Sequence, residues 1–194
     1  MFKSFSTYWL KKNGWSIKGD FKPLPDKFIL IIAPHTANID FFLGLMIRSV
    51  LGIQETKFLG KSQLFKFPYG FLFRAIGGYP VVRTKDNNLV DDVTEIFNSH
   101  EKFSIALAPE GTRSKVDRLK TGFYHIARKA NIPIYPVAFD FGTKVVIIKE
   151  PFIPSDNIES DFRKLIGFFA ESKGKYPELG FDMSILPKTI SGQK

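Results

Sequence analysis

The chain has 194 residues, 44% of them hydrophobic and 24% charged, so it can bury a sizeable core and is neither disordered nor of low complexity. It contains no cysteine, which excludes disulfide scaffolds, thiolate metal sites and cysteine nucleophiles. The formal net charge is +9, from 28 Lys and Arg against 19 Asp and Glu.

The excess positive charge is confined to residues 1–85. They hold 13 Lys and Arg against 4 Asp and Glu, whereas the rest of the chain holds 15 of each. They also hold 16 of the 29 aromatic residues. Cations mixed with large rings suit an anionic bilayer, where rings enter the acyl boundary and cations meet headgroup phosphates. A core helix with a solvated basic face is one alternative; nucleic-acid binding is another, but no recognised motif supports it and we expect no nucleic-acid partner.

Residues 1–15 are predicted to form an amphipathic helix. Phe2, Phe5 and Tyr8 recur near helical spacing with lysines beside them, and Gly14 is a stop signal. Such a helix docks on its own domain or lies on a membrane, and the segment alone does not distinguish the two. The N-terminus lacks the apolar core of a cleavable signal peptide, and no apolar run reaches the roughly 18–20 residues of a spanning helix.

Strands and helices are predicted to alternate along the rest of the chain. Short apolar runs predict strands at 27–33, 56–60, 79–82, 103–108, 133–139 and 144–148. Helices are predicted at 38–51, 62–76 with a break near Pro68, 87–99, 121–130 and 161–172, followed by a loose tail at 188–194. This order predicts an α/β fold, a single domain over 1–194 with a mostly parallel or mixed central sheet flanked by helices.

Two of the predicted strands end in the same way. Pro34 closes the first and His35 follows; Pro109 follows the strand at 103–108 and Glu110 comes next. In open α/β sheets ligands bind at the carboxyl ends of the strands. If the two strands are parallel neighbours, both polar clusters face one pocket.

The first cluster, residues 35–40, contains a histidine and a carboxylate. At a strand-to-helix junction the chain can fold the His35 imidazole back onto Asp40 in the first helical turn, with Asn38 as the expected N-cap. A carboxylate on Nδ1 fixes the tautomer and leaves Nε2 as a base for a hydroxyl nucleophile. The alternative is a helix cap beside an incidental histidine.

The second cluster is Glu110-Gly111-Thr112-Arg113-Ser114. Glycine permits close backbone approach, the hydroxyls are donors, and Arg113 can grip phosphate with two parallel hydrogen bonds. Glu110 is expected to hold Arg113 or to bind a substrate hydroxyl. A polar strand-to-helix turn is the alternative. Of the other histidines, His100 is expected at a solvated helix end and His125 on a helix face against the sheet.

Together, the His-x4-Asp junction and the Pro-Glu-Gly-Thr-Arg-Ser run 75 positions later resemble the lysophospholipid acyltransferase family, typified by 1-acylglycerol-3-phosphate acyltransferases. Residues 77–83 resemble its Gly-x-aromatic-x-x-x-Arg block, and residues 132–137 its late Pro-rich strand. The four blocks stand in the family's order. Pro34 replaces the usual Asn before the histidine, and Ala108 replaces a common aromatic residue.

The resemblance implies a glycerolipid acyltransferase-like fold. It also implies transfer of a fatty acyl group from a thioester of acyl carrier protein or coenzyme A to the free hydroxyl of a lysophospholipid. The expected acceptor is 1-acylglycerol-3-phosphate, which gives phosphatidate. By this resemblance His35 and Asp40 are the catalytic pair, and the acceptor phosphate is bound by Glu110, Gly111, Thr112, Arg113 and Arg83. No metal and no cofactor beyond the thioester co-substrate is implied.

We therefore expect a peripheral or monotopic protein at the cytoplasmic face of a membrane. Its expected partners are anionic phospholipids, the lysophospholipid acceptor and the thioester donor. Two other functions remain open. One is an acyltransferase for a different lysolipid, such as a lyso-aminolipid, which a substrate panel would distinguish. The other is a non-catalytic lipid-binding protein at the membrane surface, which a thioester turnover assay would distinguish.

Overall fold

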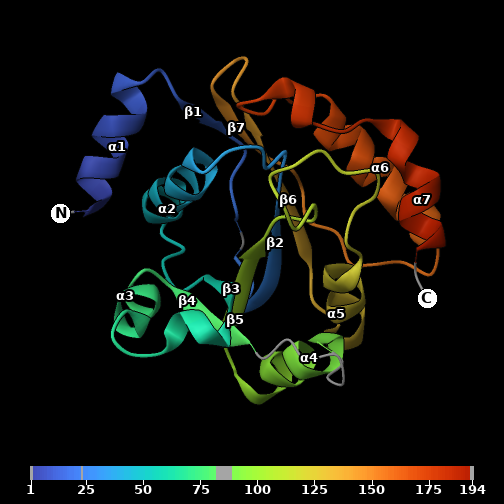
Figure 1. Cartoon of the computed structure of the whole chain (residues 1–194), viewed down its shortest axis with the longest axis horizontal. Helices are drawn as coiled ribbons and strands as arrows, with labels where there is room; N and C mark the ends of the chain where they lie inside the picture. The colour runs from blue at the N-terminus through green and yellow to red at the C-terminus, as the bar shows by residue number, and fades with distance from the viewer. Residues whose placement is uncertain (1, 23, 82–88, 193–194) are drawn as a thin grey trace.

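In the computed structural model the strands form one seven-stranded sheet, in the order β1-β7-β6-β2-β5-β3-β4 (Figure 1). The strands are β1 (Ser16–Lys18), β2 (Lys27–Ala33), β3 (Lys57–Lys61), β4 (Gly78–Val81), β5 (Phe103–Leu107), β6 (Ile134–Asp140) and β7 (Val145–Ile148). All neighbours are parallel except β6 and β7, so the sheet is mixed, as predicted. The structure describes residues 2–22, 24–81 and 89–192.

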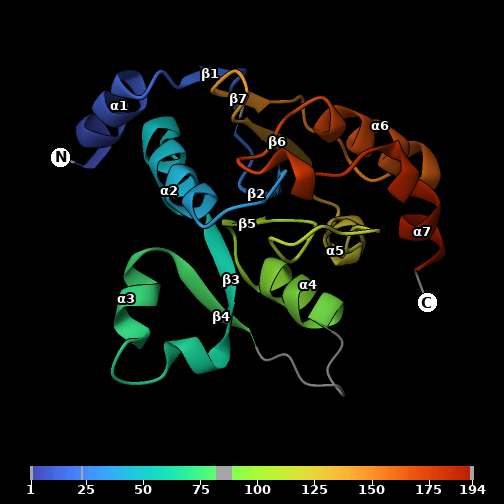
Figure 2. The same ribbon diagram turned by 45° about the horizontal axis from the view of Figure 1, so that its top comes forward.

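Helices cover both faces of the sheet (Figures 1 and 2). They are α1 (Phe2–Lys12), α2 (Ile39–Leu51), α3 (Gly70–Ala75), α4 (Leu89–Ser99), α5 (Gly122–Ala130), α6 (Ile158–Ala170) and α7 (Leu186–Ser191). Short 3-10 helices lie at Ser62–Phe65, Pro177–Leu179 and Met183–Ile185. In both views α1, α2 and α3 lie along one side of the molecule, away from α6 and α7.

The continuous apolar sequence of β2 is explained by burial on both faces. Ile29, Ile31 and Ala33 point into the core under α4, α5, α6 and α7. Phe28 and Leu30 point into a second core, which α1 and α2 cover. Side chains alternate between the faces of a strand, so a strand covered on both sides needs apolar residues at every position.

The C-terminal part of the chain differs most from the sequence-based expectation. The tail from Lys188, predicted to be loose, instead continues α7 to Ser191, where Leu186 and Thr189 are buried. The hydroxyl of Thr189 accepts a hydrogen bond from the Leu119 backbone N–H at 3.0 Å. That contact comes from residues 70 positions away, so the local sequence carries no sign of it. Residues 193–194 lie outside the described residues.

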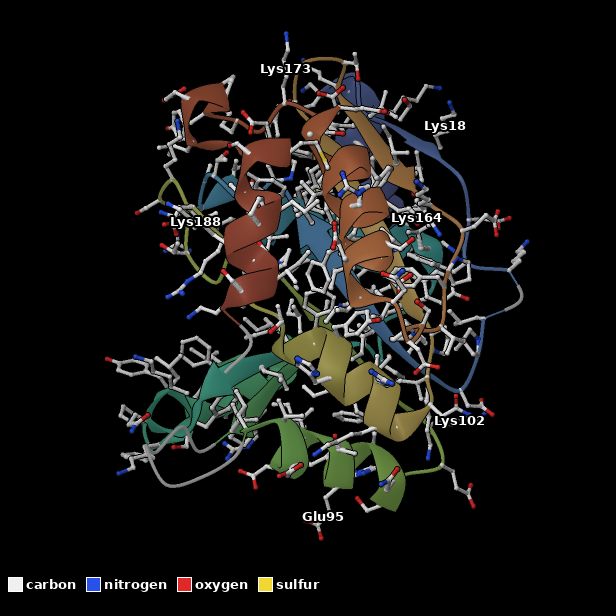
Figure 3. All side chains as sticks on the ribbon, turned by 90° about the vertical axis from the view of Figure 1, so that its right-hand side faces the viewer. Lys18, Glu95, Lys102, Lys164, Lys173 and Lys188 are labelled. Carbon is white, nitrogen blue, oxygen red and sulfur yellow. The ribbon has the colours of Figure 1, made fainter. Side chains whose placement is uncertain are left out.

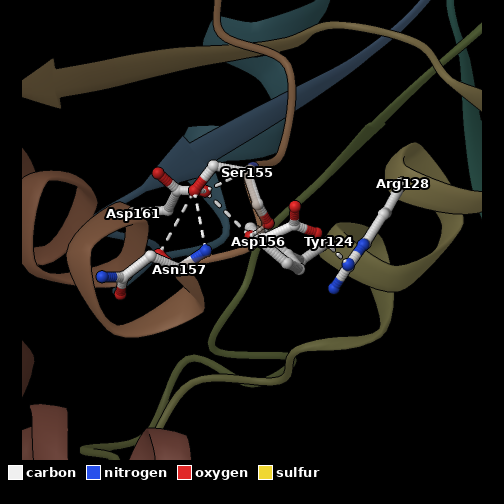
Figure 4. Close-up of polar contacts among 6 residues, drawn as sticks. All are labelled: Tyr124, Arg128, Ser155, Asp156, Asn157 and Asp161. Atoms are coloured by element: carbon white, nitrogen blue, oxygen red, sulfur yellow. Dashed lines mark hydrogen bonds and ion pairs between the residues drawn. The ribbon is translucent and has the colours of Figure 1, made fainter.

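A buried hydrogen-bond network fixes the start of α6 against α5 (Figure 4). The Tyr124 hydroxyl lies 2.8 Å from both the Ser155 carbonyl oxygen and Asp161 Oδ2. Asp161 Oδ2 also accepts from the backbone N–H and the hydroxyl of Ser155. Asn157 caps the helix by accepting from the Ser160 backbone N–H at 2.9 Å. This cap starts α6 at Ile158, three residues before the predicted start.

Candidate active site

The two polar clusters meet at one edge of the sheet because β2 and β5 are parallel neighbours. Ile31 of β2 pairs in register with Leu107, the last residue of β5, so β2 ends two residues beyond β5 at the same edge of the sheet. The backbone N–H of His35 donates a hydrogen bond of 2.8 Å to Glu110 Oε1. This contact confirms the prediction that the two clusters face one site.

Asp40 organises the loop between β2 and α2. Its side chain is buried, and Oδ2 accepts hydrogen bonds from the backbone N–H groups of Thr36 at 2.8 Å and Ala37 at 2.9 Å. Asn38 occupies the predicted N-cap position and Asp40 lies in the first turn of α2, but the Asn38 side chain makes no capping hydrogen bond. Thr36 and Ala37 precede α2, so the Asp40 carboxylate holds the loop that leads into the helix rather than capping the helix itself.

The same oxygen of Asp40 orients His35. Asp40 Oδ2 lies 3.1 Å from His35 Nδ1. A carboxylate here favours the imidazole tautomer in which Nδ1 carries the proton and donates it to Asp40, and in that tautomer Nε2 keeps its lone pair. The His35 side chain is 20% exposed, whereas that of Asp40 is 2% exposed. The arrangement presents the imidazole to a ligand while Asp40 stays hidden behind it.

Glu110 lies behind the site. It is 4% exposed, Oε1 accepts from His35, and Oε2 is buried without a hydrogen-bond partner. Burial raises the pKa of Glu110 to about 7, opposed by the hydrogen bond from the His35 N–H. Among the described residues no carboxylate lies within ion-pair distance of Arg113, so the expectation that Glu110 holds Arg113 is wrong. Its contact is with the His35 backbone instead.

The turn after Glu110 exposes the remaining residues of the second cluster. Gly111 has φ +68°, a left-handed conformation that favours glycine, and its N–H donates to the Ala108 carbonyl at 3.1 Å. Thr112, Arg113 and Ser114 are exposed, and Thr112 Oγ1 accepts from the Ser114 N–H at 3.3 Å. The turn therefore holds a guanidinium and hydroxyl groups at the surface beside His35.

A pocket of about 690 Å³ begins at these residues and runs between α2 and the sheet. His35, Asp40 and residues 111–114 line its polar end. Its walls are otherwise mainly apolar and come from β2, α2, β3, β5 and β6; they include Leu30, Ile32, Ile47, Leu59, Val137 and Phe139. The volume lies in the range of small-molecule sites, and the shape joins a polar mouth to an apolar interior.

Comparison with known families identifies the chain. A family model described as Acyltransferase matches residues 19–140, which include both clusters and most of the pocket wall. The chain belongs to this acyltransferase family. Three curated relatives, each named 1-acyl-sn-glycerol-3-phosphate acyltransferase, are 27% identical over 66% of the chain (Cocos nucifera), 29% over 88% (Saccharomyces cerevisiae) and 32% over 56% (Escherichia coli).

These matches cover only part of each relative. They span 42%, 62% and 45% of the three proteins, in the same order. The fold of the chain is also similar to a solved structure, that of the 1-acyl-sn-glycerophosphate acyltransferase PlsC from Thermotoga maritima. The TM-score is 0.58 and the sequence identity is 18%. The match covers 87% of the chain and 75% of that structure, and it supports the fold.

Two further observations bear on the residues predicted for this family member. Arg83, the second expected phosphate ligand, lies outside the described residues. His100 directly follows the end of α4, and His125 lies on α5. Neither histidine lines either of the two pockets described here.

Among the described residues, no cluster of three or more His, Cys, Asp or Glu could hold a metal ion. No described helix has the length and apolar composition needed to cross a membrane.

The sequence analysis missed one segment at the site. Residues 171–176, which we call the strap, follow α6 and lie against the loop that carries His35. The Tyr176 backbone N–H donates to Thr36 Oγ1 at 3.1 Å. The Lys173 N–H donates to Asp140 Oδ1 at 3.1 Å, and its carbonyl accepts from the Phe141 N–H at 2.8 Å. Thr36 and Tyr176 are 140 residues apart, and no motif in the strap announces this contact.

Proposed function

We propose that this chain is an O-acyltransferase that moves a fatty acyl group from an acyl thioester to the free hydroxyl of a lysophospholipid, with 1-acylglycerol-3-phosphate as the acceptor. One observation carries the proposal. His35 Nδ1 lies 3.1 Å from buried Asp40 while the imidazole faces a largely apolar pocket. Family membership and the names of the three relatives support the same reaction.

The geometry supports direct attack by the acceptor. His35 Nε2 takes the hydroxyl proton as the acceptor oxygen forms a bond to the thioester carbonyl carbon. Asp40 holds the ring in place and stabilises the imidazolium that results. The tetrahedral intermediate then collapses, the carbon–sulfur bond breaks, and the imidazolium returns the proton to the departing thiolate. The chain has no cysteine, so an acyl-cysteine intermediate is excluded.

The two ends of the pocket match the two parts of the reactants. Its apolar walls suit a fatty acyl chain, because burial of methylene groups stabilises binding by about 0.8 kcal/mol each. At the polar end, Arg113 is exposed and has no carboxylate partner among the described residues. An unpaired guanidinium suits a phosphate group, which it can bind through two parallel hydrogen bonds.

We further propose that the protein attaches peripherally to an anionic membrane. Large apolar side chains are exposed on α1 and around α3, which we call the aromatic surface: Phe2, Phe5, Tyr8, Leu64, Phe67, Tyr69, Phe71 and Leu72. Lys61 and Lys66 are exposed beside them. The opposite face of α1 buries Ser6 and Leu10, and α1 packs against α2. The helix thus docks on its own domain and still presents three rings outward, which supports both interpretations of the N-terminal segment.

Mass spectrometry of reaction products tests the proposed function. Purified protein would be incubated with a panel of lysolipids, including lysophosphatidate and a lyso-aminolipid, and with acyl coenzyme A or acyl carrier protein thioester. We expect phosphatidate to accumulate with the wild type and not with His35→Ala. Acylation of another lysolipid instead would replace the acceptor assignment. Binding of lysolipids without product from any pair would support the non-catalytic lipid-binding function.

A further inference from the structure

The strap brings a second cation to the site. Gly174 is packed so closely on Thr36 that a Cβ there would lie 2.6 Å from Thr36 Oγ1. With the hydrogen bond from the Tyr176 N–H, this contact fixes the strap against the residue that follows His35. Lys175 lies between these two anchoring points. Its position is therefore set by the His35 loop itself.

Lys175 and Arg113 line the same small pocket. The pocket holds about 340 Å³ and is formed by Thr36, Ala37, Asn38, Ile39, Arg113, Lys175 and Tyr176. Arg113 also lines the larger pocket, so it belongs to both. Neither Lys175 nor Arg113 has a carboxylate within ion-pair distance in the described part of the chain.

Two unpaired cations at one pocket repel each other unless an anion lies between them. The nearby carboxylates do not serve: Asp40 is bonded to the loop backbone and Glu110 is buried against His35. A phosphate group has the charge and the acceptor oxygens to bind a guanidinium and an ammonium together. A metal cation does not suit the pocket, because a guanidinium and an ammonium are positively charged and are not metal ligands.

We propose that Lys175 and Arg113 together bind a phosphate group of a substrate. The Glu-Gly-Thr-Arg turn supplies Arg113 on one side of this phosphate site, and the strap supplies Lys175 on the other. This inference rests on the proposed acyl transfer. The phosphate belongs to the lysophospholipid acceptor or to the phosphopantetheine of the thioester donor. Both are phosphate esters, and the experiment below separates them.

Steady-state kinetics of Lys175→Gln tests the site. The matched control is Lys173→Gln, which removes the same charge from the same strap, at a side chain that points outward near the β6–β7 turn (Figure 3). We expect the KM of the phosphate-bearing substrate to rise about tenfold in Lys175→Gln with kcat little changed, as for loss of one charge-assisted hydrogen bond. Lys173→Gln should match the wild type, and Lys175→Arg should keep most of the affinity.

Substrates without phosphate identify the source. If the acceptor phosphate is bound, Lys175→Gln raises the KM for lysophosphatidate but not for monoacylglycerol. If the donor phosphate is bound, Lys175→Gln raises the KM for acyl coenzyme A but not for an acyl thioester of N-acetylcysteamine. Equal kinetics of Lys175→Gln and Lys173→Gln in a protein that transfers acyl groups would overturn the inference and leave the proposed function intact.

A binding measurement separates failure of the site from failure of the reaction. Isothermal titration calorimetry would use sn-glycerol 3-phosphate and coenzyme A as probes. Binding that weakens in Lys175→Gln but not in Lys173→Gln supports the site even if no acyl transfer is found, in which case only the proposed function fails. A wild-type protein that binds neither probe overturns the inference.

Discussion

The backbone N–H of His35 donates a hydrogen bond of 2.8 Å to Glu110 Oε1, which joins the ends of β2 and β5 across 75 residues of sequence. The other oxygen, Oε2, is buried without a hydrogen-bond partner, and Asp40 adds a second carboxylate nearby. The loop that carries the imidazole is thus tied to a carboxyl group whose charge is disfavoured by its surroundings. The protonation of Glu110 should therefore affect how firmly this loop is held.

We expect the stability of the protein to fall as the pH rises through the range set by Glu110. Burial raises the pKa of this group from 4.5 to about 7. Between these values the unfolded chain loses a proton that the folded chain keeps, so the free energy of unfolding decreases with pH. The stabilisation is complete below pH 4.5 and lost by about pH 7. The effect is on the order of 3 kcal/mol, at 1.36 kcal/mol per pKa unit.

Urea unfolding at pH 5 and pH 8 measures this effect in the wild type and in Glu110→Gln. Glutamine carries no charge at either pH, and its oxygen can still accept from the His35 N–H. The variant should therefore lose less stability than the wild type between the two values. Glu95→Gln, at an exposed carboxylate on α4 (Figure 3), is the control and should follow the wild type. Identical pH profiles for Glu110→Gln and the wild type would contradict the prediction.

Loss of the proposed base should abolish most turnover without unfolding the protein. His35→Ala is expected to lower kcat about 10²–10⁴-fold, because His35 is the one histidine among the described residues that line the pocket, and Asp40 is already hydrogen-bonded to the loop backbone. Asp40→Asn should also be severely impaired, since the imidazole loses its orienting charge. His100→Ala, at an exposed histidine, is the control. Near-normal turnover by His35→Ala, with an unchanged melting temperature, would exclude His35 as the base.

Much of the site could be predicted because local sequence determines it. The apolar run of β2 has the predicted bounds, 27–33, since burial on both faces requires uninterrupted apolar residues. Proline after each of two such runs marks where a polar cluster begins. Parallel strands then bring His35 and Glu110 to one edge of the sheet.

The roles of single groups within the site could not be predicted, because they depend on contacts between distant residues. Asn38 stands at the predicted N-cap but makes no capping hydrogen bond, whereas Asp40 accepts from the Thr36 and Ala37 N–H groups of the preceding loop. Glu110 appears as a ligand-binding carboxylate in the sequence, but folding buries it against the His35 backbone. The strap contacts Thr36 over 140 residues and has no local pattern that would reveal it.

Gly174 should tolerate no side chain. A Cβ would lie 2.6 Å from Thr36 Oγ1 and 2.7 Å from its Cγ2, and Thr36 is buried with little room to move. We expect Gly174→Ala to destabilise the protein by about 1–3 kcal/mol, as for overpacking, and to lower kcat by displacing the His35 loop. Gly122→Ala is the control, because its Cβ would meet only an ordinary contact at 3.8 Å. Thermal unfolding and turnover would be measured together. Wild-type values for Gly174→Ala in both would refute the close packing of the strap.

Liposome co-sedimentation tests the aromatic surface. Phe67 is 97% exposed, and Tyr69 and Phe71 are exposed by about two thirds. Replacing these three with Ser should release the protein from anionic vesicles even at low salt, because insertion of rings is an apolar contribution that salt does not screen. Phe73 is kept, since its ring packs on that of Phe65, with 5.9 Å between the ring centroids, and its loss would disturb the fold.

The basic residues beside these rings should supply the salt-dependent part of vesicle binding. Lys61→Gln with Lys66→Gln removes two exposed cations, each worth about 1 kcal/mol near an anionic surface, so binding at low salt should fall roughly 30-fold. Arg74 is left in place because it donates to the Phe65 carbonyl at 3.1 Å. Lys102→Gln with Lys164→Gln, at exposed lysines shown in Figure 3, is the charge-matched control and should bind like the wild type. If the wild type stays in the supernatant with anionic vesicles at low salt, the aromatic surface does not bind membranes.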